Sequence, residues 1–438
     1  MKAHLMGICG SGMSGLAAWM SDRGYTVSGC DRDPSGEGWL RELGIPVYEG
    51  HSADHAEPGS VFVYTAAVPA DSPELAAARA SGARVLRRSE ALAEMCERHR
   101  TVAISGAHGK TTSTAMSGWI LQETGSDPTV LAGGKVRGWS GGYRRGGEIA
   151  IVEADEYDRA FLRIPHAHSA VTSFDVEHLE CYGTEELLRA AFQTFLELTA
   201  PGGGVVVPVE DTDLSIWAKR LGRKILTAGP GGDFDCTPTG PDGWGEGFEV
   251  CGVGFRLGVP GLANLRNAST GLAVESLLGI SPVEAAATLD SFPGVERRLE
   301  RLGRRGGKLI VSDYAHHPRE IAASIQAVRR AEPLLKIAVI FEPHLFSRTA
   351  RFAVEMGEAL ALADFSAVLP IYPAREQPLP GITNGLVVEA ALRAGAVSTL
   401  CEPSESVSFT DSVPAGVVVY MGAGTSDHLA RLALGGPG

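Results

Sequence analysis

The segment TVAISGAHGKTTST, residues 101–114, decides the fold of this chain. A β-rich run of five residues leads into a loop that contains Gly106 and Gly109. Lys110 and Thr111 then open a helical pattern. In a strand–loop–helix unit of this kind, backbone N–H groups and the helix dipole hold phosphate oxygens, the lysine neutralises the β- and γ-phosphates, and the threonine hydroxyl can coordinate Mg²⁺. The segment therefore predicts a nucleotide-phosphate loop within an α/β domain.

This loop is shorter than the full Walker motif, because Ile104 stands at the position of the first glycine. A chance GKT sequence in an ordinary turn is the alternative interpretation. A strand before the loop and a helix after it are the context that a phosphate loop needs, so the phosphate loop is favoured.

A second glycine-rich segment, MGICGSGMSG at residues 6–15, places Gly10, Gly12 and Gly15 directly after the strand-like run 3–8. Its G-x-G-x-x-G spacing lets backbone amides approach a diphosphate at the start of a helix. Asp31 follows the next strand, where a carboxylate can accept a hydrogen bond from a nucleotide hydroxyl. The motif alone fits a dehydrogenase, another nucleotide-binding protein or a plain tight turn. Two nucleotide-type loops in one chain disfavour the dehydrogenase, which has no need of a γ-phosphate clamp.

Short apolar runs alternate with helical patterns along most of the chain, which is typical of parallel α/β units. Because 438 residues exceed what one hydrophobic core usually supports, we expect three α/β domains, at 1–98, 99–293 and 294–438. Two helices are expected at 72–80 and 90–98. The expected strands are 3–8, 26–29, 60–64, 101–105, 149–152, 169–173, 205–209, 308–312, 336–341, 367–371 and 416–421.

Composition excludes several classes of protein. A formal net charge of −13 argues against a basic surface for nucleic acids. The seven cysteines are scattered with no CxxC pair, which argues against a disulfide framework or a zinc knuckle and favours a reducing compartment. No apolar run reaches the roughly 18 residues of a membrane span, and no signal peptide is evident. We expect a cytoplasmic protein that binds neither nucleic acid nor membrane.

Acidic and histidine side chains follow strands of the expected central domain. Glu153 comes at the end of the strand 149–152, and His178 follows the strand 169–173. Because ligands bind at the carboxyl edge of an open α/β sheet, Thr111, Glu153 and His178 could converge there on Mg²⁺. An imidazole ligand suits Mn²⁺ better and indicates that Mn²⁺ can substitute. A solvated acidic loop is the alternative.

An ordered series of motifs along nearly the whole chain resembles the Mur ligase family of peptidoglycan synthesis. These motifs are GICGSGMSG (7–15), SGAHGKTT (105–112), EADEYDRAFL (153–162), VTSFDVEHLECYG (171–183), NLRNA (264–268), FPGVERR (292–298), DYAHHPREI (313–321), FEPHLFSRT (341–349), YPAREQPLPG (372–381) and MGAGTSDHL (421–429).

The resemblance implies a Rossmann-like UDP-binding domain, a central P-loop-type ATPase domain with a mostly parallel sheet, and a C-terminal Rossmann-like domain. It also implies an ATP-dependent reaction in which the lactyl carboxylate of UDP-N-acetylmuramate is phosphorylated and then joined to the amine of L-alanine. ATP and Mg²⁺ are the implied cofactors, and the protein would be a monomer or homodimer. Two alternatives stay open: attachment of a tripeptide instead of alanine, and a nucleotide-sugar-binding protein derived from a ligase.

The family's functional residues carry over to matching positions. The UDP-sugar site would use Gly10, Ser11, Gly12, Met13, Asp31, His51, Thr65 and Ala66. The ATP site would use Gly106, His108, Gly109, Lys110, Thr111, Thr112, Asn264, Asn267, Asp313 and Arg298, with Arg297 as the alternative to Arg298. The metal ligands would be Thr111, Glu153 and His178. Alanine and the acyl phosphate would be surrounded by Tyr314, His316, His317, His344 and Arg348. The implied catalytic residues are Lys110, His178, Arg298, His316, His317 and Arg348.

Two points about the catalytic set stay open. Either His316 or His317 would take the proton of the ammonium group, and ordinary structural hydrogen bonding is the alternative for both. The chain also departs from the family pattern at Ala107, Tyr157, Glu177, Ala263, Ser312, Ala315 and Glu342. Lys110 and the arginine of the SRT motif are retained, so we expect retained chemistry.

Overall fold

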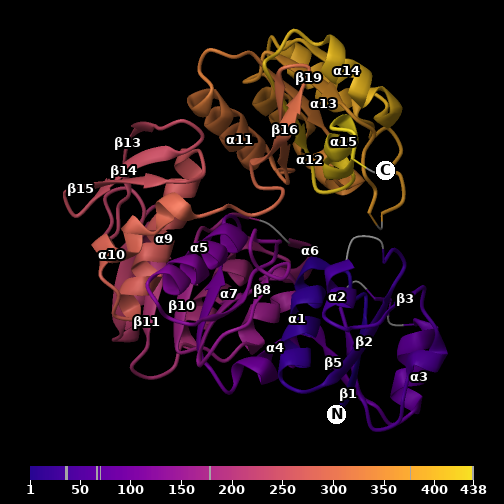
Figure 1. The fold of residues 1–438 in the computed structure, drawn as a ribbon, viewed down its shortest axis with the longest axis vertical. Helices are drawn as coiled ribbons and strands as arrows, with labels where there is room; N and C mark the ends of the chain where they lie inside the picture. The colour runs from indigo at the N-terminus through magenta and orange to yellow at the C-terminus, as the bar shows by residue number, and fades with distance from the viewer. Residues whose placement is uncertain (35–37, 66–67, 70, 177–178, 375, 437–438) are drawn as a thin grey trace. The chain divides into compact units, whose positions relative to one another are not determined.

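The computed structural model describes residues 1–34, 38–65, 68–69, 71–176, 179–374 and 376–436. Within these ranges the chain divides into two compact units. The first consists of Met1–Thr237, Phe248–Phe255 and Asn264–Pro293, and the second of Pro238–Gly247, Arg256–Ala263 and Gly294–Gly438. Helices and strands alternate through both units (Figure 1).

The first sheet has the strand order β3-β2-β1-β4-β5, and its neighbours pair in parallel. Its strands are β1 (Lys2–Met6), β2 (Thr26–Asp31), β3 (Val47–Glu49), β4 (Val61–Tyr64) and β5 (Arg84–Arg87). The connecting helices are α1 (Ser11–Asp22), α2 (Gly38–Glu42), η1 (Ala53–His55), α3 (Pro73–Ala80) and α4 (Arg88–Cys96). The strand order reverses at β1, so the loop after β1 lies where open α/β sheets bind ligands.

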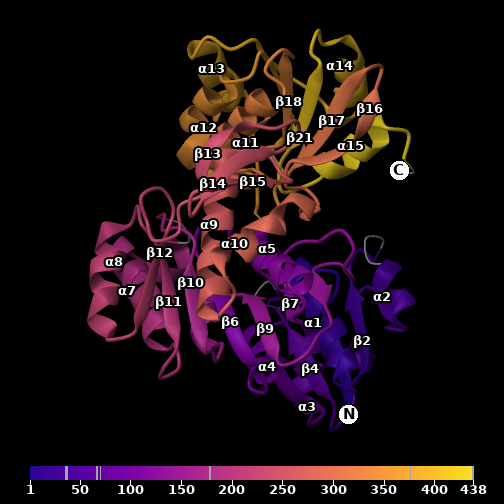
Figure 2. The same ribbon diagram turned by 60° about the vertical axis from the view of Figure 1, so that its left-hand side comes forward.

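The second sheet has the order β12-β11-β10-β6-β9-β7-β8, and within it β8 pairs antiparallel with β7. Its strands are β6 (Arg100–Ser105), β7 (Thr129–Leu131), β8 (Tyr143–Arg144), β9 (Ile149–Glu153), β10 (His168–Val171), β11 (Gly204–Pro208) and β12 (Lys224–Ala228). Its helices are α5 (Lys110–Glu123), η2 (Tyr157–Arg163), α6 (Leu179–Tyr182), α7 (Glu185–Glu197), α8 (Thr212–Ala218), η3 (Lys219–Leu221), α9 (Leu262–Leu277), α10 (Pro282–Ala287) and η4 (Leu289–Ser291). Helices α7 and α8 lie beside β10 and β11 (Figure 2).

One hydrophobic core serves both of these sheets. Trp19 of α1 is 1% exposed and stacks on Tyr143 of β8 with 6.4 Å between ring centroids. The Tyr143 hydroxyl donates a 2.8 Å hydrogen bond to Asp22. Gly15 allows the close approach of Leu131, whose side chain would collide with a Cβ there. Residues 98 and 99 both belong to the first unit, and Pro293 and Gly294 belong to different units. The expected domain bounds stay a prediction.

The second unit is built on a sheet of order β16-β17-β21-β18-β19-β20, in which β16 is antiparallel to β17 and the other pairs are parallel. Its strands are β16 (Glu300–Arg305), β17 (Lys308–Asp313), β18 (Ile337–Phe341), β19 (Phe365–Val368), β20 (Ser398–Leu400) and β21 (Val417–Met421). The helices are α11 (Pro318–Ala331), α12 (Phe346–Leu360), α13 (Gly385–Arg393), η5 (Pro403–Glu405), α14 (Ser406–Ser412) and α15 (Ser426–Ala433). A small further sheet consists of β13 (Thr237–Pro241), β14 (Glu246–Val250) and β15 (Val253–Leu257).

The α/β class with mostly parallel sheets is confirmed, and every expected strand is present within a few residues. The expected strand 367–371 lies two to three residues too far toward the C-terminus, because the apolar run continues past Val368, where β19 ends. Short strands at sheet margins, such as β3 and β20, were not expected, since they are mostly exposed and carry little apolar pattern. Among the described residues, every helix is too short or too polar to cross a bilayer.

Candidate functional site

The phosphate loop lies at the carboxyl end of β6, between β9 and β10. Gly106 has φ +137°, and a Cβ there would collide with the side chain of Thr172 and approach the backbone N of Ser173 to 2.9 Å. Gly109 has φ +80°, and a Cβ there would collide with the Asn267 side chain. Both positions therefore require glycine for conformation and for space. This is the strand–loop–helix unit that the sequence predicts.

Lys110 is the first residue of α5, and its ammonium group is held among oxygens. Nζ donates to Gly106 O at 2.7 Å and to Glu156 Oε1 at 2.8 Å. Burial by itself lowers the pKa of Lys110, but Glu156, Asp155 and Glu153 raise it above its ordinary value. The side chain is therefore charged at neutral pH and could exchange Glu156 for a phosphate oxygen.

The first turn of α5 contains two buried threonines directly after this lysine. Thr111 and Thr112 are each 7% exposed. Before them, the backbone N–H of His108 donates to Ser173 Oγ at 2.9 Å, and His108 Nε2 lies 3.1 Å from Asp175 Oδ2. These contacts fix the loop against the end of β10, so the N–H groups at the start of α5 have a defined direction.

Glu153 ends β9 next to the phosphate loop, since it pairs with Ile104 in the parallel register. Its Oε2 accepts a 2.6 Å hydrogen bond from the N–H of Gly133. Together with Thr111 it gives the oxygen donors that Mg²⁺ prefers, so the described donor set fits this ion. His178, the third predicted ligand, lies outside the described residues.

Asn267 and Asn264 of α9 reach the same loop. Asn267 Nδ2 donates to Asn264 Oδ1 at 3.2 Å, and Ser113 Oγ donates to Asn267 Oδ1 at 3.4 Å. The structure therefore brings these two predicted ATP-site residues to the beginning of α5. Their contact with adenine stays a prediction.

The first glycine loop joins β1 to α1, with Gly10 directly before the helix. Asp31, at the end of β2, accepts a 2.9 Å hydrogen bond from the N–H of Cys9. Met13 is buried in the core and Ser11 is exposed, so only the backbone of Met13 could face a ligand. A Cβ on Gly7 would lie 3.6 Å from Thr65 Cγ2, which places Thr65 beside the loop.

Arg88, the first residue of α4, was not predicted and lies against this loop. A Cβ on Gly12 would lie only 2.5 Å from Arg88 Nη1. The other guanidinium nitrogen, Nη2, is 3.3 Å from Asp155 Oδ2. No short motif marks this arginine in the sequence. Of the two remaining predicted UDP-sugar residues, His51 contacts Cys30 and Glu74. Ala66 lies outside the described residues.

In the second unit, Asp313 ends β17 and is 4% exposed. Its carboxylate accepts hydrogen bonds from the N–H groups of Leu299 and Ala315, both at 2.8 Å, and from Ser324 Oγ at 3.1 Å. Burial raises its pKa above the ordinary aspartate value, although Arg298 and these hydrogen bonds act in the opposite direction. The carboxylate of Asp313 thus connects the end of β17 to Leu299, Ala315 and Ser324 through hydrogen bonds. The predicted contact of Asp313 with the ATP ribose stays a prediction.

Two arginines approach one aromatic ring in this unit. The guanidinium carbons of Arg297 and Arg298 lie 4.7 and 4.9 Å from the centroid of the Tyr314 ring. Arg297 is also anchored, because Nη2 donates to Gly422 O at 2.9 Å. Of the two alternatives for the γ-phosphate, Arg297 is therefore already engaged by backbone oxygens.

His316, His344 and Arg348 form a group at the carboxyl end of the second unit's sheet. The rings of His316 and His344 are 5.7 Å apart, and Arg348 Nη1 lies 3.4 Å from His344 Nδ1. Burial lowers the pKa of His316, Glu320 raises it and Arg348 lowers it again, with a net result below the ordinary value. His317 instead packs edge-on against Phe352 at 5.0 Å. Of the two adjacent histidines, His316 therefore belongs to the group that contains Arg348.

The glycine loops at the carboxyl ends of parallel sheets and the buried lysine are typical of α/β nucleotide-binding proteins.

Family models match at residues 2–100 (Mur ligase family, catalytic domain) and 297–424 (Mur ligase, glutamate ligase domain). The UDP-N-acetylmuramate–L-alanine ligase of Chlorobaculum parvum is 39% identical over 98% of this chain and 95% of that protein, and that of Streptomyces avermitilis is 37% identical over 98% and 96%. The crystal structure of the UDP-N-acetylmuramate–alanine ligase of Thermotoga maritima matches with a TM-score of 0.86 and 28% identity, over 99% of this chain and 98% of that one. The chain belongs to the Mur ligase family.

Proposed function

We propose that the chain is an ATP-dependent ligase that joins L-alanine to the lactyl carboxylate of UDP-N-acetylmuramate. The observation that carries this proposal is the full-length similarity to curated ligases of that name, together with a charged lysine held in a phosphate loop. The reaction belongs to peptidoglycan precursor synthesis. We further propose a cytoplasmic location, because all seven cysteines are free thiols, as in reducing compartments. A monomer or homodimer stays the proposed oligomeric state.

A carboxylate resists attack by an amine, because its charge repels the nucleophile and its oxygen is a poor leaving group. In the proposed reaction a lactyl carboxylate oxygen attacks the γ-phosphorus of ATP and ADP leaves. The alanine amine then attacks the acyl carbon, and inorganic phosphate leaves with that carboxylate oxygen. Such chemistry needs positioning and positive charge more than a protein nucleophile.

Lys110 supplies that positive charge at the phosphate loop. Its ammonium group is 2.8 Å from Glu156 and would move to the β- and γ-phosphate oxygens when they compete with that carboxylate. Arg298 is the proposed second cation for the γ-phosphate, because Arg297 donates to Gly422 O. Charge that is already positioned costs little reorganisation when the transition state forms.

Thr111 and Glu153 would hold Mg²⁺, with His178 as the third proposed ligand, and Mn²⁺ can take the same place. When bound, the ion would offset phosphate charge and fix the geometry of the transferred group. The hydrogen bond from Gly133 to Glu153 orients the carboxylate for this role.

On the amine side, we assign the base to His316 and not to His317. The lowered pKa of His316 keeps its imidazole neutral near pH 7, so that it can accept the proton of the alanine ammonium group. Arg348, in the same group, can hold the alanine carboxylate through paired hydrogen bonds.

A tripeptide ligase is the second candidate. The murein peptide ligase of Psychrobacter arcticus matches over 99% of this chain with a TM-score of 0.72, but at 21% identity this match shows the fold alone. The higher identity to alanine ligases favours L-alanine.

One assay tests the proposal directly: ADP formation with UDP-N-acetylmuramate and a panel of L-alanine, L-serine, glycine and a tripeptide. We expect turnover to require both the UDP-sugar and the amino compound, with L-alanine giving the highest kcat/KM. Preference for the tripeptide would replace alanine with the second candidate. ADP formation that needs neither partner would contradict a ligase.

A further inference from the structure

A cluster of histidine, cysteine and glutamate side chains lies in the first unit, away from the phosphate loop. His4 comes from β1, Cys30 from β2, His55 from η1 and Glu74 from α3. One ligand atom from each of these four residues lies within 4.8 Å of every other. His4, Cys30 and Glu74 are buried, and His55 is partly buried. Nothing in the proposed ligase chemistry requires this grouping.

The distances from Glu74 Oε1 to the other three donors are close to those of a tetrahedral metal site. Glu74 Oε1 is 2.9 Å from His55 Nδ1, 3.4 Å from His4 Nε2 and 3.2 Å from Cys30 Sγ. Zinc–donor bonds of about 2.0–2.3 Å place tetrahedral donors about 3.3–3.8 Å apart. Side-chain movements of less than about 1 Å would therefore arrange these donors around one ion.

His4 is oriented as a metal ligand. Its Nδ1 is 3.0 Å from Ser28 Oγ, which fixes the ring as hydrogen bonds commonly do for ligating histidines. Its Nε2 is buried and, among the described residues, has no hydrogen-bond partner, although it lies 3.4 Å from Glu74 Oε1. A buried ring nitrogen without a hydrogen bond is costly. Coordination of a cation would satisfy it.

The charges of the cluster also fit a dication. Burial works against ionisation of Glu74, but the neighbouring His4, His55 and Cys30 hold its pKa below the ordinary value. Burial and Glu74 raise the pKa of Cys30, so without a metal its thiol stays protonated and donates to Glu74. A dication would displace that proton to solvent. One Zn²⁺, one thiolate and one carboxylate then sum to zero, which is favourable for a buried site.

We propose that His4, Cys30, His55 and Glu74 bind one zinc ion and thereby join β1, β2, η1 and α3. Sulfur and imidazole donors select Zn²⁺ over Mg²⁺, which prefers oxygen ligands. The site would be structural, since four protein ligands complete the tetrahedron. The site uses none of the residues assigned to ATP or alanine. His51, which is assigned to the UDP-sugar, contacts two of the proposed ligands, Cys30 and Glu74.

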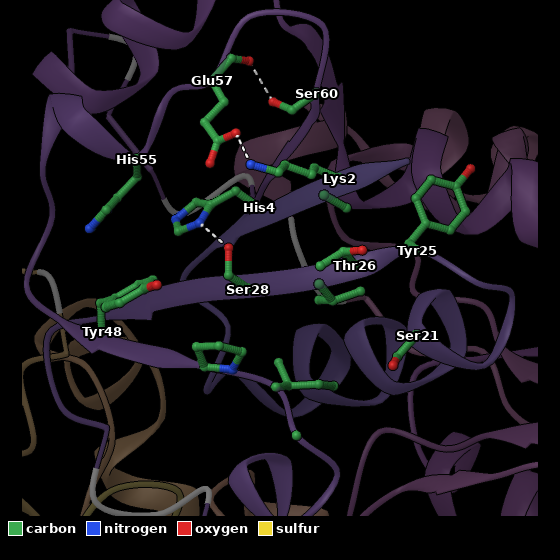
Figure 3. A pocket seen from close by; sticks show the side chains of 15 residues that line it. Lys2, His4, Ser21, Tyr25, Thr26, Ser28, Tyr48, His55, Glu57 and Ser60 are labelled. Carbon is green, nitrogen blue, oxygen red and sulfur yellow. Dashed lines mark hydrogen bonds and ion pairs between the residues drawn. The ribbon is translucent and has the colours of Figure 1, made fainter.

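A pocket borders the two histidines of this cluster. It measures about 340 Å³, and His4 and His55 line it together with Lys2, Ser28 and Tyr48. Figure 3 shows these side chains around the pocket, with His4 joined to Ser28 by a hydrogen bond. The His4 and His55 rings stack at 4.8 Å, and the Tyr48 and His55 rings at 5.2 Å.

The test is a cobalt and zinc titration of the full chain after treatment with a chelator. Co²⁺ bound to a thiolate gives a near-ultraviolet charge-transfer band, whereas Co²⁺ bound only by oxygen and nitrogen at the phosphate loop does not. We expect the band to reach its plateau at one equivalent, to survive excess Mg²⁺ and to disappear when Zn²⁺ is added.

Two variants and two matched controls locate the site. Cys30→Ser should abolish the band, and Cys30→Ser and His55→Ala should each weaken zinc binding by at least about 100-fold. Cys251→Ser and His428→Ala change an exposed cysteine and an exposed histidine, and should leave band and affinity unchanged. Circular dichroism melts show whether each variant is folded.

The wild-type titration decides the matter even if Cys30→Ser does not fold. Absence of a thiolate–cobalt band in the folded wild-type chain would overturn the proposal and leave the cluster as a hydrogen-bonded network around Glu74. A band that persists in folded Cys30→Ser, or that Cys251→Ser removes, would equally overturn it. Loss of ligase turnover with zinc binding intact would count against the proposed function alone.

Discussion

The two glycine loops of the first unit use the same backbone design with different sources of positive charge. The loop of residues 106–109 carries its own cation, Lys110, which sits among carboxylates. The loop of residues 7–10 is followed by no lysine at the start of its helix, and Arg88 of α4 approaches Gly12 in the first turn of that helix. We assign Lys110 to the phosphates of ATP, which react, and Arg88 to the diphosphate of the UDP-sugar, which is only held. The difference predicts which variants stop chemistry and which weaken binding.

The largest effect is expected at Lys110. Lys110→Ala should lower kcat by at least about 10³-fold, because a positioned charge at the transferred phosphoryl group is lost. Binding of UDP-N-acetylmuramate, measured by calorimetry, should stay nearly unchanged. Lys2→Ala, at an exposed ion pair, is the control. Near-normal turnover in Lys110→Ala would remove the functional distinction between the loops.

The next effect concerns the pH dependence of the amine step. His316→Gln should lower kcat by about 10²-fold, the usual contribution of a general base. Because the folded pKa of His316 lies below the ordinary value, the wild-type kcat should persist through that ordinary value and fall only at lower pH. If His317→Gln changes the pH profile of kcat and His316→Gln does not, His317 and not His316 is the general base.

Arg88 tests the loop of residues 7–10. Arg88→Ala should raise KM for UDP-N-acetylmuramate by about 10- to 100-fold, the value of one or two charge-assisted hydrogen bonds. KM for ATP should change less than about threefold. Arg145→Ala, at an exposed arginine paired with Asp22, serves as the control. Equal changes in both KM values would show that Arg88 does not act on the UDP-sugar alone.

The smallest effect is expected at Arg348. Arg348→Lys keeps the charge but loses the planar fork, so KM for L-alanine should rise about tenfold while KM for ATP is nearly constant. Steady-state kinetics with each substrate varied in turn gives both values. An unaltered KM for L-alanine would place Arg348 outside the amine side.

The parts of the molecule that could be predicted from the sequence are those whose secondary structure and functional residues lie in one continuous segment. The segment 101–114 shows strand, glycine loop and lysine in one run, and the structure has them in that order. Arg88 could not be found this way, because its contact with Gly12 joins positions 76 residues apart and no motif marks it. The same holds for Glu74, whose partners His4 and Cys30 are brought to it only by sheet order. The predicted contacts of His178 and Ala66 lie outside the described residues.

The central claim is that the carboxylate is phosphorylated before it meets the amine. UDP-N-acetylmuramate labelled with ¹⁸O in its lactyl carboxylate tests it, with the released phosphate examined by mass spectrometry. The account predicts that each turnover with L-alanine transfers one carboxylate oxygen to inorganic phosphate. Phosphate that carries no label, while amide is still formed, would contradict it.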